Sequence, residues 1–256
     1  MQNYYENIFK QIILDRNFDL IHSINWPTEF SSVYFDDNFN LNLDGLIFPN
    51  NINAIYFGET YNQPINNIKF PRFLRKIYLG NNFNQPIDIL SQNQYLNYLY
   101  IGNSFNQDIE HIIFTNELEN IYIGHGFNKN LNNFKIPENL QFLELGNSFN
   151  QNINNLIFKR TLRTLKLGNN FNRELNNIKI NSHTDLILKY GNYNTINNLP
   201  DNLGYLIIEN LDHPLKNLPK NLVYLEVMDF DYDLNKASII PPKCKLVLTS
   251  KRCYDM

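Results

Sequence analysis

Apolar residues recur along most of the chain in one pattern with a period of 22 residues. The clearest marker of the pattern is an aromatic residue followed directly by Asn, which occurs eight times at equal intervals. The eight pairs are Phe39-Asn40, Tyr61-Asn62, Phe83-Asn84, Phe105-Asn106, Phe127-Asn128, Phe149-Asn150, Phe171-Asn172 and Tyr193-Asn194. A period of about 20 to 29 residues is typical of solenoids, in which short coils stack on one another.

We number positions as offsets from the marker aromatic, which is offset zero. In the first seven repeats, offsets −9, −6, −4, +4, +7 and +9 are also apolar, with Gln92 as the one polar exception. Offsets −6 and −4 alternate with positions expected to be exposed, which is the periodicity of a β-strand. Offsets +7 and +9 alternate in the same way and predict a second extended stretch on the opposite side of the coil. One coil cannot bury its own apolar face, whereas coils stacked at the strand spacing of ~4.8 Å bury it continuously. The pattern predicts a single β-rich solenoid, a right-handed superhelix of about ten coils.

Two polar or small positions keep the same register. Gly occupies offset −3 in six repeats, where the strand ends, and we expect unusual backbone dihedrals there. Asn occupies offset +1 in all eight repeats, and stacked Asn side chains can bond each other or the backbone of the adjacent coil. We therefore predict a buried structural ladder. Its members are Asn40, Asn62, Asn84, Asn106, Asn128, Asn150, Asn172 and Asn194.

The two ends of the chain depart from the pattern. Residues 181–200 break the frame, after which the segment 199–206 is echoed by 218–225, and 241–248 reads as a final edge strand. Near the N-terminus, apolar residues at helical spacing predict a short amphipathic helix that caps the first coil. They are Tyr5, Ile8, Phe9, Ile12 and Ile13. The expected organisation is a helical cap over 1–25 and a solenoid over 26–256, with 22-residue coils to about 198 and shorter coils over 199–256.

One exposed stripe stands out as a candidate binding site. Offset −5 lies between two buried strand positions and carries five tyrosines in register, followed by Glu144, while Tyr98 and Phe142 at offset −7 widen the stripe. The candidate partner-binding residues are Tyr34, Tyr56, Tyr78, Tyr98, Tyr100, Tyr122, Phe142 and Glu144. Tyrosine is enriched at protein interfaces because it gives a large, stiff contact area. Rings that only pack on each other across strands, with no partner, are the alternative.

Composition narrows the function classes. The chain has 47 Asn and only two Ala, which argues against a helical repeat array. Its net charge of −3 does not indicate binding to nucleic acid or to an acidic membrane surface, and no apolar run is long enough to cross a membrane. Cys244 and Cys253 are expected to be free thiols. The sequence shows no metal-ligand spacing, nucleophile motif or phosphate-binding loop, so we expect no enzyme activity, cofactor or metal.

The repeat resembles a known family. Phe83-Asn84-Gln85-Pro86-Ile87, preceded by Leu74, Ile77, Leu79 and Gly80, resembles the FNIP repeat, a relative of leucine-rich repeats. The resemblance covers roughly residues 26–200 and implies a leucine-rich-repeat-like solenoid. FNIP-repeat proteins are known from social amoebae and from giant viruses that infect amoebae. Many of them join the repeats to an N-terminal F-box, which implies substrate recognition for a ubiquitin ligase, but residues 1–25 are too few for such a domain.

These observations together predict a non-enzymatic module that binds another protein through the tyrosine-bearing face. Two alternatives stay open: a substrate-recognition subunit linked to a ubiquitin ligase, and a structural or virion scaffold protein. The expected partner is a protein, with no nucleic acid and no membrane. The chain is expected to be a monomer in the cytoplasm, which would be the host cytoplasm if the protein is viral.

Overall fold

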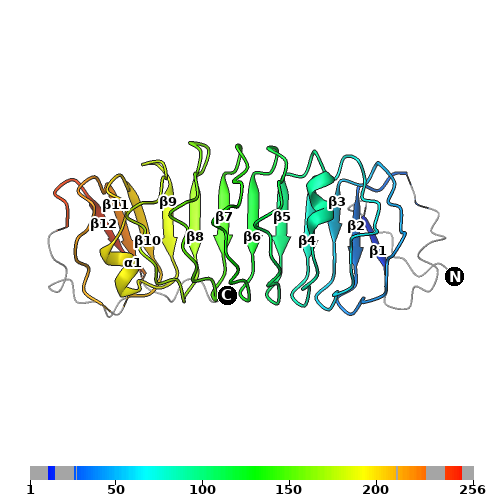
Figure 1. Cartoon of the computed structure of the whole chain (residues 1–256), viewed down its shortest axis with the longest axis horizontal. Coiled ribbons are helices and arrows are strands. Elements are labelled where there is room, and N and C mark those ends of the chain that lie inside the picture. Colours follow the sequence, from blue (N-terminus) through cyan, green and yellow to red (C-terminus); the bar gives the residue numbers. More distant parts are fainter. Residues whose placement is uncertain (1–10, 15–25, 27, 212, 229–239, 250–256) are drawn as a thin grey trace.

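A single parallel sheet runs through the computed structural model, which describes residues 11–14, 26, 28–211, 213–228 and 240–249 (Figure 1). The strands lie in the sheet in chain order, and each is hydrogen-bonded to the next coil's strand. They are β1 (Gln11–Leu14), β2 (Ser32–Phe35), β3 (Ala54–Tyr56), β4 (Lys76–Leu79), β5 (Tyr98–Ile101), β6 (Asn120–Ile123), β7 (Phe142–Leu145), β8 (Thr164–Leu167), β9 (Asp185–Leu188), β10 (Tyr205–Ile208), β11 (Tyr224–Val227) and β12 (Lys245–Leu248).

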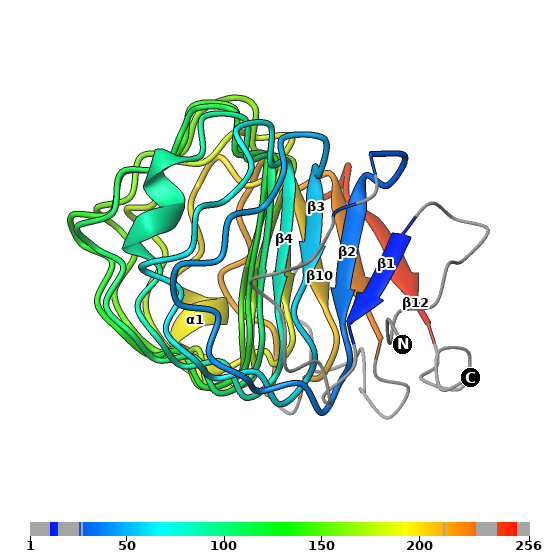
Figure 2. The same cartoon turned by 90° about the vertical axis from the view of Figure 1, so that its right-hand side faces the viewer.

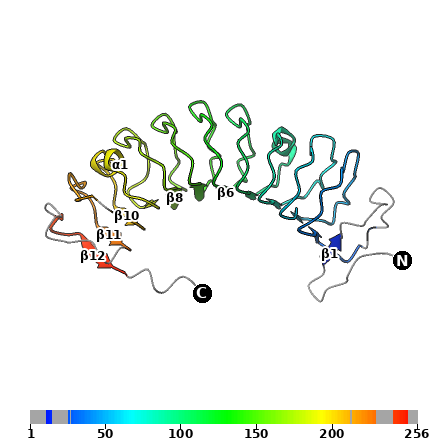
Figure 3. The same ribbon diagram turned by 90° about the horizontal axis from the view of Figure 1, so that it is seen from below.

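The predicted β-rich solenoid is therefore confirmed. Viewed along the stack, the strands gather on one side of the coils and the loops form the remainder (Figure 2). Seen from below, the solenoid is an arc with the sheet on its inner, concave side (Figure 3). The hand of the superhelix stays a prediction.

The core lies between the sheet and the loops and follows the apolar offsets. In most strands the second and fourth residues are buried and the first and third are half-buried, as in β5 and β8. The marker aromatics from Phe39 to Phe171 form a fully buried column, in which neighbouring ring centroids lie 5.9 to 6.4 Å apart. Each coil thus presents its apolar side chains to the same side chains of the coils above and below.

The glycines at offset −3 form a column, and they are required for a different reason from the unusual backbone dihedrals that the sequence led us to expect. Among the described glycines only Gly45 has a positive φ, so the column does not need left-handed dihedrals. A Cβ on Gly102 would instead lie 2.3 Å from the carbonyl oxygen of Gly80, and one on Gly80 would lie 2.0 Å from that of Gly58. The glycines are needed because the backbones of adjacent coils approach too closely at this corner for any side chain.

The asparagine ladder is confirmed as a hydrogen-bonded structure. The side-chain Oδ1 of each ladder Asn from Asn40 to Asn172 accepts from the backbone N–H of the ladder Asn in the next coil, at 2.9 to 3.1 Å. The expectation that the ladder is buried is wrong. Asn106 and Asn128 are exposed and Asn84 is half-buried, because offset +1 faces outward directly after the buried aromatic.

The second extended stretch forms no second sheet within the described residues. It is reduced to two isolated parallel bridges, Ile47 with Lys69 and Ile157 with Lys179. In the coil that carries Gln92, the stretch is replaced by a short 3-10 helix, η2 (Asp88–Gln92). The one polar exception in the apolar pattern therefore marks the place where the coil changes its local structure.

At the N-terminus the helical prediction is wrong for the residues that the structure describes. Ile12 and Ile13 lie in β1, which pairs in parallel with β2. The sheet edge decides this, because the unpaired N–H and C=O groups of β2 are satisfied by another strand rather than by a helix. The other residues of the predicted cap, including Tyr5, Ile8 and Phe9, lie outside the described residues.

At the C-terminal end, the frame break contains β9 and one short helix, α1 (Tyr193–Asn197), which the sequence pattern did not predict. The two echoed segments form β10 and β11, paired in register, and the predicted edge strand is β12. The Thr195 hydroxyl donates to the carbonyl oxygens of Phe171 and Arg173 at 3.3 and 3.0 Å, which ties α1 to the preceding coil.

Candidate functional site

The concave face of the sheet is built from the first and third residues of each strand. The strand register places Tyr34 beside Tyr56, Tyr56 beside Tyr78, and Tyr78 beside Tyr100. The row continues through Tyr122 to Glu144 in β7. All the candidate residues of the predicted stripe lie on this face and are half-buried, as are Tyr98 and Phe142 on the neighbouring row.

The rings on this face form one continuous stack, which we call the tyrosine ladder. Its members are Tyr34, Tyr56, Tyr78, Tyr98, Tyr122 and Phe142. Centroids of successive rings lie 4.1, 4.4, 4.9, 5.2 and 4.4 Å apart, and the first pair is almost parallel, at 4°. Tyr100 stands beside the ladder, 5.7 Å from Tyr78 and 6.2 Å from Tyr122. Sequence analysis placed Tyr98 and Phe142 at the margin of the stripe, whereas the structure places them within the stack.

Stacking determines what the ladder can present to a partner. Because the ring faces cover one another, the ring edges and hydroxyl groups are the parts left accessible. Burial raises the pKa of Tyr56, and a hydrogen bond with Tyr34 raises it further. Burial likewise raises the pKa of Tyr100, with a smaller contribution from the carboxylates of Glu59 and Glu144. The hydroxyls of Tyr56 and Tyr100 therefore stay neutral at physiological pH and can both donate and accept hydrogen bonds.

The C-terminal half of the same face is charged rather than aromatic. Lys166 pairs with Glu209 at 3.1 Å, and Lys189 pairs with Glu144 at 3.8 Å. Farther along, Glu226 accepts hydrogen bonds from the Tyr224 hydroxyl at 2.9 Å and from the Thr249 hydroxyl at 3.1 Å. The concave face thus changes from stacked rings to ion pairs near β7.

Sequence analysis missed Lys189, Glu209 and Glu226 as members of this face. Lys189 and Glu209 directly follow β9 and β10, at the strand-end position that Gly occupies in the middle coils. The available signal was the absence of glycine at that position. A larger residue there indicates that the backbones of adjacent coils are far enough apart to admit a side chain. The frame break obscured it by shifting the count by one residue.

The described residues offer little for chemistry. No group of three or more His, Cys, Asp and Glu residues in the described part of the chain could hold a metal ion. No helix among those residues is long and apolar enough to cross a membrane. Cys244 is a free, half-buried thiol whose pKa is raised by burial, while Cys253 lies outside the described residues.

Comparison with known proteins identifies the repeat. Residues 39–81 match the family model described as FNIP Repeat. Among the curated proteins none matches the chain. Among solved structures, the chain is similar to the giant-virus protein CroV588, described as a novel circular LRR protein structure, with 22% sequence identity and a TM-score of 0.48. The match covers 88% of this chain and 44% of that one, so the chain spans less than half the length of that protein. The chain is thus a parallel β-solenoid that carries an FNIP-repeat match at residues 39–81.

Proposed function

We propose that the chain is a protein-interaction module that binds its partner on the concave face of the sheet. Repeat solenoids of this type generally serve as interaction scaffolds. The observation that carries the proposal is the uninterrupted tyrosine ladder, whose rings are half-buried in the free chain and end at a cluster of ion pairs on the same face.

The ladder suits binding because it is already ordered. Association normally costs entropy when mobile side chains at an interface become fixed. In the ladder each ring is held by its neighbours, so a partner that covers the ring edges immobilises little that was free. Tyrosine also combines apolar contact area with a hydrogen-bonding group, which is why it is frequent among residues that dominate binding energy.

The same ring contacts also stabilise the sheet, by about 0.2 to 1 kcal/mol for each cross-strand pair. Stabilisation of the sheet alone would explain the stacked rings without any binding partner. The two roles are therefore separated by a binding measurement combined with a stability measurement.

The test uses the double variant Tyr78→Ser/Tyr100→Ser as bait in affinity purification from native or infected cells. We expect a correctly folded variant that loses a partner retained by the unchanged chain. The matched control is Phe73→Ser/Tyr95→Ser, because these two exposed rings lie 5.3 Å apart outside the strands. Retention of every partner by the concave-face variant, with a normal thermal melt, would show that the ladder is not the interface.

The proposal includes a protein as the partner and a monomeric chain acting in the cytoplasm. Sedimentation analysis of the purified chain and imaging of the tagged chain in cells test these two points.

A further inference from the structure

A second surface, away from the sheet, concentrates positive charge. We call it the basic flank and define it as offsets +8 to +11 of the coils whose marker aromatics run from Phe39 to Phe171. It carries six exposed cations and one carboxylate, Glu138, in a chain whose net charge is −3. The cations are Lys69, Arg72, Lys135, Lys159, Arg160 and Lys179. Lys159 pairs with Glu138 at 3.8 Å, and the other five have no ion-pair partner among the described residues.

The flank is one continuous surface because its positions stack from coil to coil. Parallel bridges join Ile47 to Lys69 and Ile157 to Lys179, which aligns the +8 positions in a column. At offset +11, the Arg72 backbone N–H donates to Asn50 Oδ1 at 3.1 Å, so this position stacks in the same way. Charges that are distant in sequence therefore share one side of the stack, with Lys69, Lys135 and Lys179 in the +8 column and Arg72 and Arg160 in the +11 column.

The same column holds three exposed isoleucines and three lysines, with Ser91 between Lys69 and Ile113. Ile47, Ile113 and Ile157 are 58%, 68% and 61% exposed, which makes them the three most exposed large apolar residues of the described chain. A solenoid surface needs no apolar residue at these outward positions, since Lys occupies the equivalent position in three other coils. Apolar side chains grouped on an exposed surface are typical of interaction sites.

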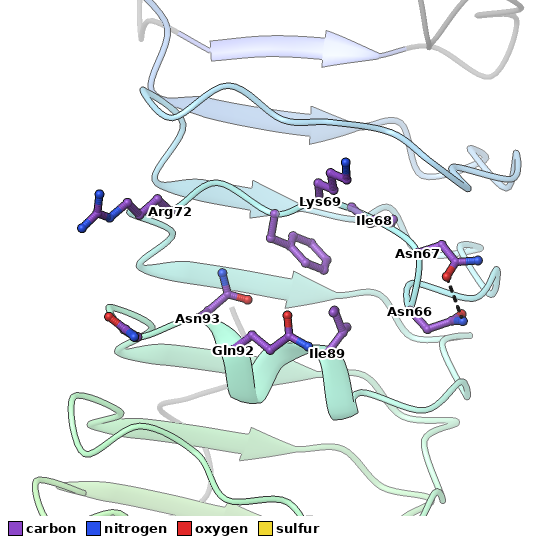
Figure 4. Close-up of a pocket in the computed structure, with 10 residues that line it drawn as sticks. Asn66, Asn67, Ile68, Lys69, Arg72, Ile89, Gln92 and Asn93 are labelled. Carbon is purple, nitrogen blue, oxygen red and sulfur yellow. Dashed lines mark hydrogen bonds between the residues drawn. The ribbon is translucent and has the colours of Figure 1, made fainter.

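Two hollows open on the flank. The first, of about 650 Å³, lies where η2 replaces the extended stretch, and it is lined by Phe70 and Ile89 together with Lys69 and Arg72 (Figure 4). Figure 4 also shows Gln92 and Asn93 on the η2 side of this hollow. The second, of about 590 Å³, is lined by Phe134 and Ile136 with Lys135 and Lys159, and Ile113 and Ile157 border it on the two adjacent coils. Each hollow thus combines an apolar lining with cations: Lys69 and Arg72 without an ion-pair partner at the first, and Lys135 without one at the second, where Lys159 pairs with Glu138.

We propose that the basic flank binds an extended acidic segment of a partner protein, with apolar side chains of that segment seated in the two hollows. Its carboxylates complement the unpaired lysines and Arg72, and its apolar side chains cover the exposed isoleucines and the aromatic linings. This inference does not depend on the concave face.

The chemistry favours this occupant over other polyanions. Nucleic acid would satisfy the cations but carries no aliphatic side chains for the hollows or the isoleucines. The headgroups of an acidic membrane would bind the cations and its apolar interior would contact the isoleucines. A lipid surface, however, does not insert discrete side chains into hollows between coils. The hollows are about three coils apart, roughly 15 Å at strand spacing, which an extended segment spans in about five residues.

The experiment measures fluorescence anisotropy of a labelled peptide of about 12 residues, built from Asp and Glu with two Leu about five residues apart. We expect saturable binding to the full chain that weakens about tenfold for Lys69→Glu/Lys135→Glu at low salt. The control Lys129→Glu/Arg173→Glu makes the same charge change at two exposed residues at offset +2, off both the flank and the concave face, and should leave binding unchanged. Ile113→Ser/Ile157→Ser, which removes only exposed apolar groups, should also weaken binding without lowering the melting temperature.

Three results would overturn the proposal. The first is no saturable binding, and the second is equal binding by a peptide in which Ser replaces both Leu. The third is loss of binding in both charge variants, which would reflect overall charge rather than the flank. Tighter binding of single-stranded RNA, or of phosphatidylserine vesicles, than of the peptide would assign the flank to that class of ligand instead.

Discussion

Tyr61 is the only residue with a hydroxyl group among the seven aromatics of the core column from Phe39 to Phe171. It is fully buried, and its hydroxyl finds no hydrogen-bond partner among the described residues. Burial raises its pKa, as expected for a phenol held away from water. The neighbouring coils show that phenylalanine fits the same position, with ring centroids about equally spaced on either side.

Tyr61→Phe should therefore stabilise the chain. Removing an unpaired buried hydroxyl recovers a desolvation cost of about 1 to 3 kcal/mol, and the ring itself is retained. The measurement is thermal or denaturant unfolding of the two proteins. Tyr56→Phe is the control, since that hydroxyl lies on the half-exposed concave face and bonds Tyr34, and it should not stabilise. A Tyr61→Phe protein less stable than the parent would indicate a partner for the hydroxyl.

A second residue-scale prediction concerns pH. Asp185, at the start of β9, has a pKa raised by burial. Below its unfolded-state pKa the carboxyl is neutral in both states and has no effect, whereas above the raised folded pKa it must ionise in a half-buried position. Asp185→Asn should therefore raise the melting temperature at about pH 7, and the gain should vanish by about pH 3. Asp201→Asn, at an exposed corner, is the control. A gain for Asp185→Asn that does not change with pH would contradict the burial effect.

At the scale of elements, each coil is tied to the next by the asparagine ladder as well as by the sheet. Gln side chains at offset +2 reinforce the row, since Gln107 Nε2 donates to both the backbone and the side-chain oxygen of Asn84 at 3.0 Å. The sheet holds one corner of the coil and the ladder holds another, so neighbouring coils cannot rotate against each other without breaking hydrogen bonds.

Asn106→Ala should lower stability by about 1 kcal/mol, because the backbone N–H of the exposed residue Asn128 loses its acceptor. The measurement is the free energy of unfolding. Asn194→Ala is the matched control at the end of the row, where the backbone N–H donates to Asn172 Oδ1 and no described N–H donates to the Asn194 side-chain oxygen. An equal effect of both substitutions would mean that the cost comes from local backbone preference rather than from the ladder.

At the scale of the whole molecule, stacking turns a 22-residue pattern into long surfaces. Residues at one offset form a line along the solenoid. A residue type that recurs at that offset in several coils therefore forms a stripe on the surface. The concave face carries the tyrosine ladder and the ion pairs, and a separate side carries the basic flank. A partner on one face leaves the other accessible, which allows two independent binding sites on one chain.

Local order explains why most of this fold could be predicted. Side-chain alternation places Val33 and Phe35 inward and Tyr34 outward whatever the rest of the chain does. The repeat then makes every neighbour of a coil a near copy of itself, so the strand register follows from the period. The prediction failed where this reasoning has no support, at residues 11–14, whose apolar spacing suits a helix but whose position meets an open sheet edge.

The sequence by itself determined the period, the inward and outward positions, the β-rich solenoid and the place of the tyrosine stripe, because these depend on contacts within one coil and between equal positions of adjacent coils. Only the tertiary structure decided that Tyr98 rather than Tyr100 continues the ring stack, and that Lys166 pairs with Glu209 across the frame break. It also showed that glycine is required at offset −3 because the backbones of adjacent coils approach closely there, and not because of a turn conformation. These outcomes depend on distances between side chains and backbones of different coils, which a one-dimensional pattern does not contain.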